Sequence, residues 1–260
     1  MIQDFLLRVR RKEKWYHKLI YETALHLRYL RLPFPKVIGG ILFYARSILL
    51  VLWRRLKQFF YYEPMFRFRC NQVGKGVYFE SNFPLIMGYG SIFVGNRVRI
   101  SGNVNLFVSY KVNPNPTIQI GDDVYLGYGS IYSCADKIRI GNRVLIAQGA
   151  SIYDNNNHPL DPKARAENKP VERGNVAPVV IEDDVWIGSN AVILKGVTVG
   201  RGAIIATEAV VANNVPPMTI VAGNPAKVVK HLKDDNYSKK LNSDKLRKRR
   251  YQNASRTPTK

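Results

Sequence analysis

An Ile or Val residue falls at every sixth position of the chain from Ile181 to Val211, and a small or branched apolar residue follows four positions after each one. An α-helix repeats every 3.6 residues or so, and a flat strand about every 2, so neither produces this spacing. A period of six residues predicts short extended segments separated by corners, which is the pattern of a parallel β-helix. The members of the first set are Ile181, Ile187, Ile193, Val199, Ile205 and Val211.

The same register continues upstream and predicts a long all-β solenoid. A Gly-polar pair follows the first apolar residue in three of the upstream sets, at Gly95-Asn96, Gly121-Asp122 and Gly141-Asn142. Gly and Asn tolerate the positive φ angles of tight corners, so these pairs are expected to turn the chain. The upstream apolar positions are Val94, Ile100, Leu106, Ile120, Leu126, Tyr132, Ile140, Ile146 and Ile152, with a weaker copy at Val73, Phe79 and Leu85.

Charge divides the molecule into three parts. The net charge of the chain is +21, but residues 70–226 contribute only +1. Residues 1–69 contribute +11 and residues 227–260 contribute +9. The solenoid is therefore nearly neutral, and the basic character lies in two appendages. We expect a helical appendage at 1–69, a β-helix domain at 70–230 and a flexible basic tail at 231–260.

The apolar stretch Val37–Trp53 in the first appendage is interrupted by Arg46. At helical spacing, Arg46, Ser47, Arg54 and Lys57 gather on one side of the helix. A basic strip beside an aromatic and aliphatic face is typical of a helix lying on an anionic membrane. A central Arg would cost a full span about 3 kcal/mol or more. The other apolar positions are Ile41, Leu42, Ile48, Leu49, Leu52 and Leu56.

The membrane contacts expected on this helix are Arg46, Trp53, Arg54 and Lys57. Two alternatives stay open: a helix that caps the solenoid or packs in an oligomer, and a true membrane span. The charged segment 1–15 lacks the features of a signal peptide, so we expect a protein peripheral to the cytoplasmic face of the membrane. The basic tail has few aromatic residues, and anionic lipid is favoured over nucleic acid as its partner; a solvated tail without a dedicated role is the alternative.

Two cysteines, Cys70 and Cys134, are too few for a disulfide framework, and no histidine stands near either in sequence. A cysteine nucleophile is therefore not expected. His158 is the single histidine between positions 27 and 230, and it precedes Pro159 where the repeat breaks off. The repeat resumes with Val185-Trp186-Ile187-Gly188.

With these motifs the segment from Val73 to Lys230 resembles the hexapeptide-repeat acyltransferases, and within them the sugar and xenobiotic O-acetyltransferases. The resemblance implies a left-handed parallel β-helix in which three hexads form one triangular coil. It also implies a homotrimer with active sites in the grooves between solenoids. The coils expected on this basis are 73–90, 94–111, 120–137, 140–157, 181–198 and 199–216.

The resemblance implies that His158 is the general base for acetyl transfer from acetyl-CoA to a hydroxyl. An imidazole whose pKa lies near neutrality suits this proton transfer. Asp154 is a candidate to orient the imidazole, with a corner residue as the equal alternative. The solenoid offers one histidine and so lacks the three that the zinc of a related carbonic anhydrase needs; no metal is expected.

The resemblance also places the coenzyme. Ser189 and Thr207 match positions that contact coenzyme A, and Lys227 and Lys230 match basic residues at the nucleotide phosphates. Trp186 is expected to wall the acceptor or pantetheine site. Tyr128 is assigned to the same wall, in a stretch where relatives often carry an acceptor-facing Asn.

The long basic appendage resembles that of enzymes of surface-polysaccharide assembly. The expected acceptor is therefore a sugar, either lipid-linked or a polysaccharide precursor. The alternatives are a drug or soluble sugar as acceptor, and a non-catalytic structural solenoid at a membrane. Residues 1–69 are too short and too basic for the nucleotide-binding domain of a nucleotidyltransferase.

Overall fold

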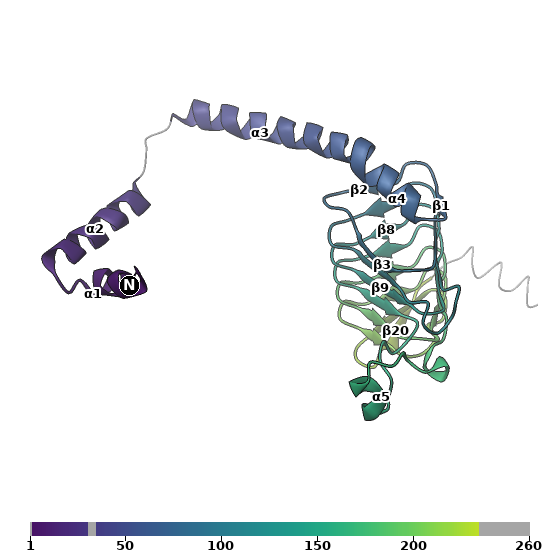
Figure 1. Ribbon diagram of the computed structural model, residues 1–260. Coiled ribbons are helices and arrows are strands. Elements are labelled where there is room, and N and C mark those ends of the chain that lie inside the picture. The colour runs from purple at the N-terminus through teal and green to yellow at the C-terminus, as the bar shows by residue number, and fades with distance from the viewer. Residues whose placement is uncertain (1, 31–34, 234–260) are drawn as a thin grey trace, which may run out of the picture. The chain divides into compact units, whose positions relative to one another are not determined.

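The computed structural model describes residues 2–30 and 35–233. Contacts divide the chain into two compact units, Met1–Trp53 and Arg54–Lys260 (Figure 1). Residues 234–260, which hold most of the expected basic tail, lie outside the described residues. The helices before the solenoid are α1 (Ile2–Arg11), α2 (Trp15–Tyr29), α3 (Lys36–Lys57), the π-helical turn η1 (Gln58–Tyr62) and α4 (Glu63–Arg69).

Helices α1 and α2 form a small hairpin. Val9 and His17 are its buried residues, and the imidazole ring of His17 lies edge-on to Phe5 with 5.6 Å between ring centroids. Lys12, at a φ of 56°, stands in the turn between the two helices. The hairpin therefore holds itself together with a few side chains and leaves most of its apolar residues exposed.

Three parallel sheets form the solenoid and confirm the period of six residues (Figure 1). The first sheet contains β1 (Gln72–Val73), β4 (Ser91–Val94), β7 (Thr117–Ile120), β10 (Lys137–Ile140), β13 (Val179–Ile181) and β16 (Thr198–Val199). The second contains β2 (Tyr78–Phe79), β5 (Arg99–Ile100), β8 (Tyr125–Leu126), β11 (Leu145–Ile146), β14 (Trp186–Ile187), β17 (Ile204–Ile205), β19 (Thr219–Ala222) and β20 (Lys227–His231). The third contains β3 (Leu85–Gly88), β6 (Asn105–Val108), β9 (Ile131–Cys134), β12 (Ser151–Tyr153), β15 (Val192–Ile193) and β18 (Val210–Val211).

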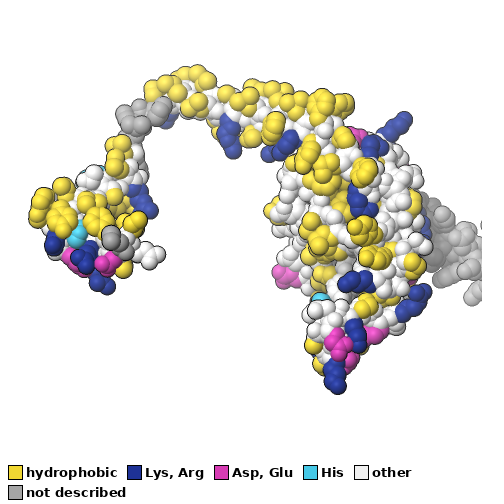
Figure 2. All heavy atoms as spheres, in the orientation of Figure 1, with side chains coloured by type: hydrophobic (Ala, Val, Ile, Leu, Met, Phe, Trp, Pro, Cys, Tyr) yellow, Lys and Arg dark blue, Asp and Glu magenta, His cyan; other side chains and the backbone are white. Residues whose placement is uncertain are grey.

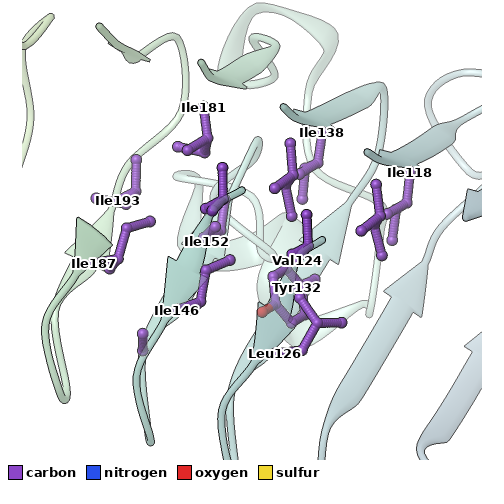
Figure 3. Close-up of a cluster of buried hydrophobic side chains, with 14 of the residues drawn as sticks. Ile118, Val124, Leu126, Tyr132, Ile138, Ile146, Ile152, Ile181, Ile187 and Ile193 are labelled. Carbon is purple, nitrogen blue, oxygen red and sulfur yellow. The ribbon is translucent and has the colours of Figure 1, made fainter. Parts of the chain in front are cut away.

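Each apolar position of the repeat pairs with its counterpart in the next coil. Ile140 pairs with Ile181 in the first sheet, and Ile146 pairs with Ile187 in the second. Their side chains point inward and form one continuous core, as the isoleucines of Figure 3 show. The parallel pairing throughout the coils fits the left-handed β-helix expected from the sequence.

The glycines of the Gly-polar pairs are required for close approach of the coils, and not for positive φ as the sequence suggested. Positive φ falls two residues later, at Arg97 (54°), Asp123 (58°) and Arg143 (55°). A Cβ atom on Gly121 would lie 2.6 Å from the carbonyl oxygen of Gly141 in the next coil. At Gly121 the coils are therefore stacked too tightly for a side chain, and the residue two positions later makes the turn.

An amide and carboxylate ladder ties this corner from coil to coil. The backbone N–H groups of Lys75, Asn96, Asp122 and Asn142 each donate to a side-chain oxygen of the next coil at 2.7–2.9 Å. The last acceptor is Asp183. The N–H of Asn96 lowers the pKa of Asp122, and the N–H of Asn142 lowers that of Asp183, because each stabilises the charged carboxylate.

Residues 58–69 cap the first coil of the solenoid. The Gln58 side chain donates to the Val77 carbonyl at 3.1 Å and accepts from the Phe79 N–H at 3.0 Å. Phe66 is buried, and its ring lies edge-on to Phe79 with 5.1 Å between centroids. One sequence alternative, capping by the helix, therefore holds for the residues that follow Lys57. At the other end, β20 turns back antiparallel to β19.

We predict that Gly121→Ala lowers the free energy of unfolding by about 1–3 kcal/mol, because the new methyl group forces the stacked backbones apart. Gly174 is the matched control, since nothing lies within 4 Å of a Cβ built there. Thermal unfolding of the two alanine variants measures the difference. Equal stability of both variants would show that the corner can relax.

Candidate functional site

The long break in the repeat lies between β12 and β13 and contains the short helix α5 (Pro162–Ala166) and the 3-10 turn η2 (Arg173–Asn175). Its two ends are joined at the base. Asn155 forms an antiparallel bridge with Val176, and the N–H of Ala177 donates to the Asp154 carbonyl at 2.8 Å. The insertion therefore leaves the solenoid and returns to it at one closed point, so the coils on either side stay paired.

Asp154 holds the corner beneath this insertion. Its side chain is fully buried, and its two carboxylate oxygens accept the backbone N–H groups of Ala135 at 2.7 Å and Asp136 at 2.8 Å. Asn155 donates a third hydrogen bond to it at 2.9 Å. Among the described residues Asp154 makes no hydrogen bond to His158. The geometry therefore favours the corner role that the sequence left open, over the role of orienting the imidazole.

A polar network carries the chain from this corner to His158. The Asn155 side-chain amide donates to the Ser133 carbonyl at 3.1 Å, and its oxygen accepts the N–H of Asn157 at 2.6 Å. The Ser133 hydroxyl donates to the Asn157 side chain. Asn157 has a φ of 61°, which Asn tolerates better than most residues. The network thus fixes the backbone immediately before His158, whose own N–H donates to the Asn156 carbonyl at 2.7 Å.

The imidazole of His158 is exposed and stands between two cavities. One, of about 210 Å³, is bounded by the loop after β6, by Ser133 and by the returning part of the insertion. The other is more open and is bounded by Tyr153, Leu194 and Arg165. A side chain between two cavities can take a proton from a group bound in one and pass it to a group bound in the other.

Arg165 fixes the chain after His158. Its guanidinium donates to the carbonyl of Pro159 at 3.0 Å and to that of Leu160 at 2.6 Å. Asp161 caps the N-terminus of α5 by accepting the N–H of Ala164 at 2.9 Å. His158 is thus held between two ordered turns, one on each side in the chain.

The cavity of about 210 Å³ has a basic lining. Lys111 and Lys169 both line it, together with Asn157, Asn168 and His158, and no acidic residue does. Lys169 pairs with Glu167 at 2.6 Å, whereas Lys111 has no ion pair within the described part of the chain. The guanidinium of Arg173 donates to the Val112 carbonyl at 3.5 Å and so connects the two loops that frame the cavity. The arrangement suits an anionic ligand.

Cys134 lies behind this cavity and is not a nucleophile. Its thiol is buried, and burial raises its pKa far above the usual value, with the nearby Asp154 carboxylate acting in the same direction. Burial also raises the pKa of Cys70 to about 12. Both thiols therefore stay protonated at neutral pH.

The other residues predicted from the sequence lie elsewhere on the solenoid. Tyr128, Ser189 and Thr207 stand at the corner where the second sheet gives way to the third, whereas His158 stands where the third gives way to the first. Trp186 is half exposed on the outer face of the second sheet. Within one chain, the third sheet therefore separates these four residues from His158.

Ser133 and Ala135 of the preceding coil line the cavity of about 210 Å³, and Tyr128 does not line it within one chain. Ser133 pairs with Tyr153 in the third sheet, next to the turn that carries His158. Sequence reasoning missed it, together with Asn155 and Asn157. The available signal was the run of three Asn residues immediately before His158.

Lys227 and Lys230 lie exposed on β20, opposite Ala222 and Ile220 of β19. This position leaves both ammonium groups open to an anionic ligand. Over the described ranges, no group of three or more His, Cys, Asp or Glu side chains is placed to hold a metal ion.

Residues 178–213 match the bacterial transferase hexapeptide family (six repeats). A Schizosaccharomyces pombe protein with a provisional acetyltransferase name is 35% identical over 118 residues, which cover 45% of this chain and 55% of that protein. The 2,3,4,5-tetrahydropyridine-2,6-dicarboxylate N-acetyltransferase of Staphylococcus aureus is 53% identical over 78 residues, covering 30% of this chain and 33% of the relative. The chain thus spans about half, or less, of the length of these relatives.

AntD, an N-acyltransferase from Bacillus cereus solved in complex with dTDP and 3-hydroxybutyryl-CoA, shares the fold. Its TM-score is 0.56 at 20% identity, and the alignment covers 74% of this chain and 98% of AntD. The resemblance to hexapeptide-repeat acyltransferases is thereby confirmed in the repeat sequence and in the fold.

We predict that Asp154→Ala lowers the free energy of unfolding by about 3 kcal/mol, because it leaves two buried N–H groups without an acceptor. Asp161→Ala is the matched control: it removes an exposed helix cap at the same insertion and should cost about 1 kcal/mol. Thermal unfolding of both variants measures the contrast. A smaller loss for Asp154→Ala than for Asp161→Ala would contradict the corner role.

Proposed function

We propose that this protein is an acyl-CoA-dependent acyltransferase that moves an acetyl group from acetyl-CoA to a hydroxyl of a sugar, with His158 as the general base. The observation that supports it best is the position of His158. The side chain stands between two cavities at the one long interruption of a hexapeptide-repeat solenoid. A purely structural solenoid would not need an exposed imidazole on a hydrogen-bonded turn there.

The chemistry needs one base and no covalent enzyme intermediate. A ring nitrogen of His158 takes the proton of the acceptor hydroxyl as its oxygen attacks the thioester carbonyl carbon. The resulting oxyanion collapses, the carbon–sulfur bond breaks, and the imidazolium returns the proton to the departing thiolate. The products are the acetyl ester and coenzyme A with a free thiol.

The donor site requires a second copy of the chain. Ser189, Thr207 and Trp186 are our candidates for contact with the coenzyme, yet the third sheet separates them from His158 within one chain. A trimer of solenoids packed side by side would bring His158 of one subunit to that face of the next. Lys227 and Lys230 are candidates to bind the nucleotide phosphates by charge-assisted hydrogen bonds.

The basic cavity indicates the class of acceptor. Lys111 and Lys169 line it without an acidic residue on the wall, which favours a sugar that carries a phosphate. A lipid-linked or nucleotide-linked sugar has this chemistry, and a neutral free sugar or an uncharged drug does not. We therefore favour a phosphate-linked precursor of a surface polysaccharide.

An amine acceptor is the second candidate. It is favoured by the names of the Staphylococcus aureus relative and of AntD, both of which transfer to nitrogen. The same base would serve, because an attacking amine must also lose a proton. If the protein acetylates an amino sugar faster than the sugar that carries a hydroxyl at the same position, N-acylation would replace O-acylation as the proposed reaction.

We predict that His158→Ala lowers turnover of acetyl-CoA by about 100- to 10,000-fold, because a positioned general base contributes a factor of that order. Release of the coenzyme A thiol with N-acetylglucosamine 1-phosphate as acceptor is the measurement. His26→Ala is the control, since His26 is an exposed histidine on α2. Turnover of His158→Ala within a factor of a few of the parent would remove the general-base role.

We predict that Lys111→Met raises the KM for N-acetylglucosamine 1-phosphate by about tenfold, the value of one charge-assisted hydrogen bond. The KM for N-acetylglucosamine should change little. Lys137→Met is the matched control, because Lys137 is exposed on β10 outside the cavity. Equal effects of Lys111→Met on both acceptors would argue against phosphate recognition, while leaving the role of His158 untouched.

A further inference from the structure

Helix α3 presents a long apolar face that no described part of the chain covers. Ile41, Leu42, Ile48, Leu49 and Leu52 are each more than half exposed. In Figure 2 the side chains along α3 are mostly apolar, and basic side chains emerge along one edge. Exposed apolar residues are common singly, but a continuous stripe of this length marks an interaction surface.

The polar residues of α3 form a separate strip along its whole length. At 100° per residue, Lys36, Gly40, Ser47 and Arg54 fall within an arc of about 40°, and Lys57 and Arg46 lie about 60° and 80° to one side of it. The Ser47 hydroxyl donates to the Phe43 carbonyl at 2.8 Å, so it is satisfied inside the helix. Phe43 and Leu50 also fall on this strip, whereas Leu49 lies on the apolar face. Arg55 departs from the pattern, and its guanidinium lies 5.7 Å from the centroid of the Tyr78 ring.

The charge around this helix has one sign. No Asp or Glu occurs in the sequence from Thr23 to Tyr62. An apolar face flanked by cations without anions is complementary to a bilayer with anionic headgroups, where the apolar side chains enter the acyl boundary and the cations meet phosphate. The basic residues of this segment are Arg28, Arg31, Lys36, Arg46, Arg54, Arg55 and Lys57.

Residues 58–69 pack against the solenoid, and α3 does not pack in that way. Gln58, Tyr62 and Phe66, which follow directly in the same continuous helix, are buried and contact the first coil. None of the α3 residues is buried. The surface of α3 is therefore suited to a different partner from the surface of residues 58–69.

By length and composition, the helix Lys36–Arg69 could also cross a membrane. The strip of polar residues argues against a span, because Arg46 and Ser47 would sit near the middle of the hydrocarbon. A helix in the interface keeps the whole strip in contact with water and headgroups. Polar residues recur along this side of the helix from Lys36 to Lys57, and are not confined to its two ends. This distribution is typical of an interfacial helix.

We infer that α3 lies in the interface of an anionic bilayer, with its apolar face in the acyl boundary, and that it tethers the solenoid to the membrane. Residues 58–69 continue the same helix and bind the first coil through Gln58 and Phe66. A docked α3 therefore holds the solenoid at the surface. This inference stands without the proposed function; with it, the acceptor would be a lipid-linked sugar.

Flotation of the full chain with vesicles tests the docking. We expect the protein to float with vesicles of phosphatidylcholine and phosphatidylglycerol, to bind vesicles of phosphatidylcholine alone less, and to lose affinity for the anionic vesicles as salt is raised. Protein that stays unbound to anionic vesicles at low salt would overturn the inference. Protein extracted from vesicles only by detergent, and not by alkaline carbonate, would indicate a span and would also overturn it.

Leu49→Glu and Leu50→Glu form a matched pair, because they make the same change in charge and size at adjacent positions about 100° apart around the helix, with Leu49 on the apolar face and Leu50 on the polar strip. We expect Leu49→Glu to weaken vesicle binding by at least about tenfold, as burial of one leucine is worth that much, and Leu50→Glu to have a much smaller effect. Equal losses in both variants would mean that only net charge matters and would contradict an inserted apolar face. Thermal unfolding and turnover of N-acetylglucosamine 1-phosphate, measured without vesicles, control for folding.

Failure of this inference is distinguishable from failure of the proposed function. Loss of vesicle binding with normal turnover of N-acetylglucosamine 1-phosphate separates docking from catalysis. If the parent protein associates through α3 with a second copy instead, Leu49→Glu would change its oligomeric state without vesicles, and that result would overturn the membrane assignment.

Discussion

The close stacking of successive coils is the constraint on which the rest of the structure depends. Each coil pairs with the next through parallel backbone hydrogen bonds, and at one corner the backbones approach so closely that a Cβ atom on Gly95, Gly121 or Gly141 would clash with the next coil. The Cβ distance of 2.6 Å from Gly121 to Gly141 measures how little room is left. The carboxylates and amides beside these glycines accept the N–H groups of the preceding coil, so the corner is bonded as well as packed. A solenoid of such closely stacked coils is stiff. It can carry a long insertion at a corner, where the chain leaves one coil and returns to the next.

The candidate site uses that opening. The insertion after β12 leaves through Asp154 and returns through Ala177, and the carboxylate of Asp154 replaces the backbone bonds that the interrupted coil would have supplied to Ala135 and Asp136. A buried carboxylate is costly unless its oxygens are bonded, and here three N–H donors satisfy it. Hydrogen bonds among Asn155, Asn157 and Ser133 connect this corner to the backbone just before His158.

The helical region before the solenoid buries its apolar side chains in one part and leaves them exposed in another. Residues 58–69 bury their apolar side chains on the first coil, where the stack would otherwise end exposed. Helix α3 has a comparable apolar content but leaves it uncovered, with a strip of cations beside it. One continuous helix therefore has two kinds of surface, and the change from one to the other lies near Lys57.

The sequence by itself determined the period of six and the place of the long break, and its resemblance to the hexapeptide-repeat acyltransferases implied the three-sided coil and made His158 the candidate base. The apolar residue of each six-residue repeat faces the core in every coil. The repeat, and any interruption of it, can therefore be recognised in the sequence alone. The expectation that the corner glycines adopt positive φ angles was wrong, because these glycines instead allow the backbones of successive coils to approach closely. Such proximity between coils cannot be read from a single stretch of sequence.

Tertiary structure alone decided that Asp154 serves the corner, that Ser133 faces the cavity, and that Ser189 and Thr207 stand across the third sheet from His158. These facts depend on which corner of the triangle a residue occupies and on what lies in the coils beside it. Residues as far apart in the sequence as Asp136 and Asp154 become neighbours only when the coils stack, and no local pattern records that contact.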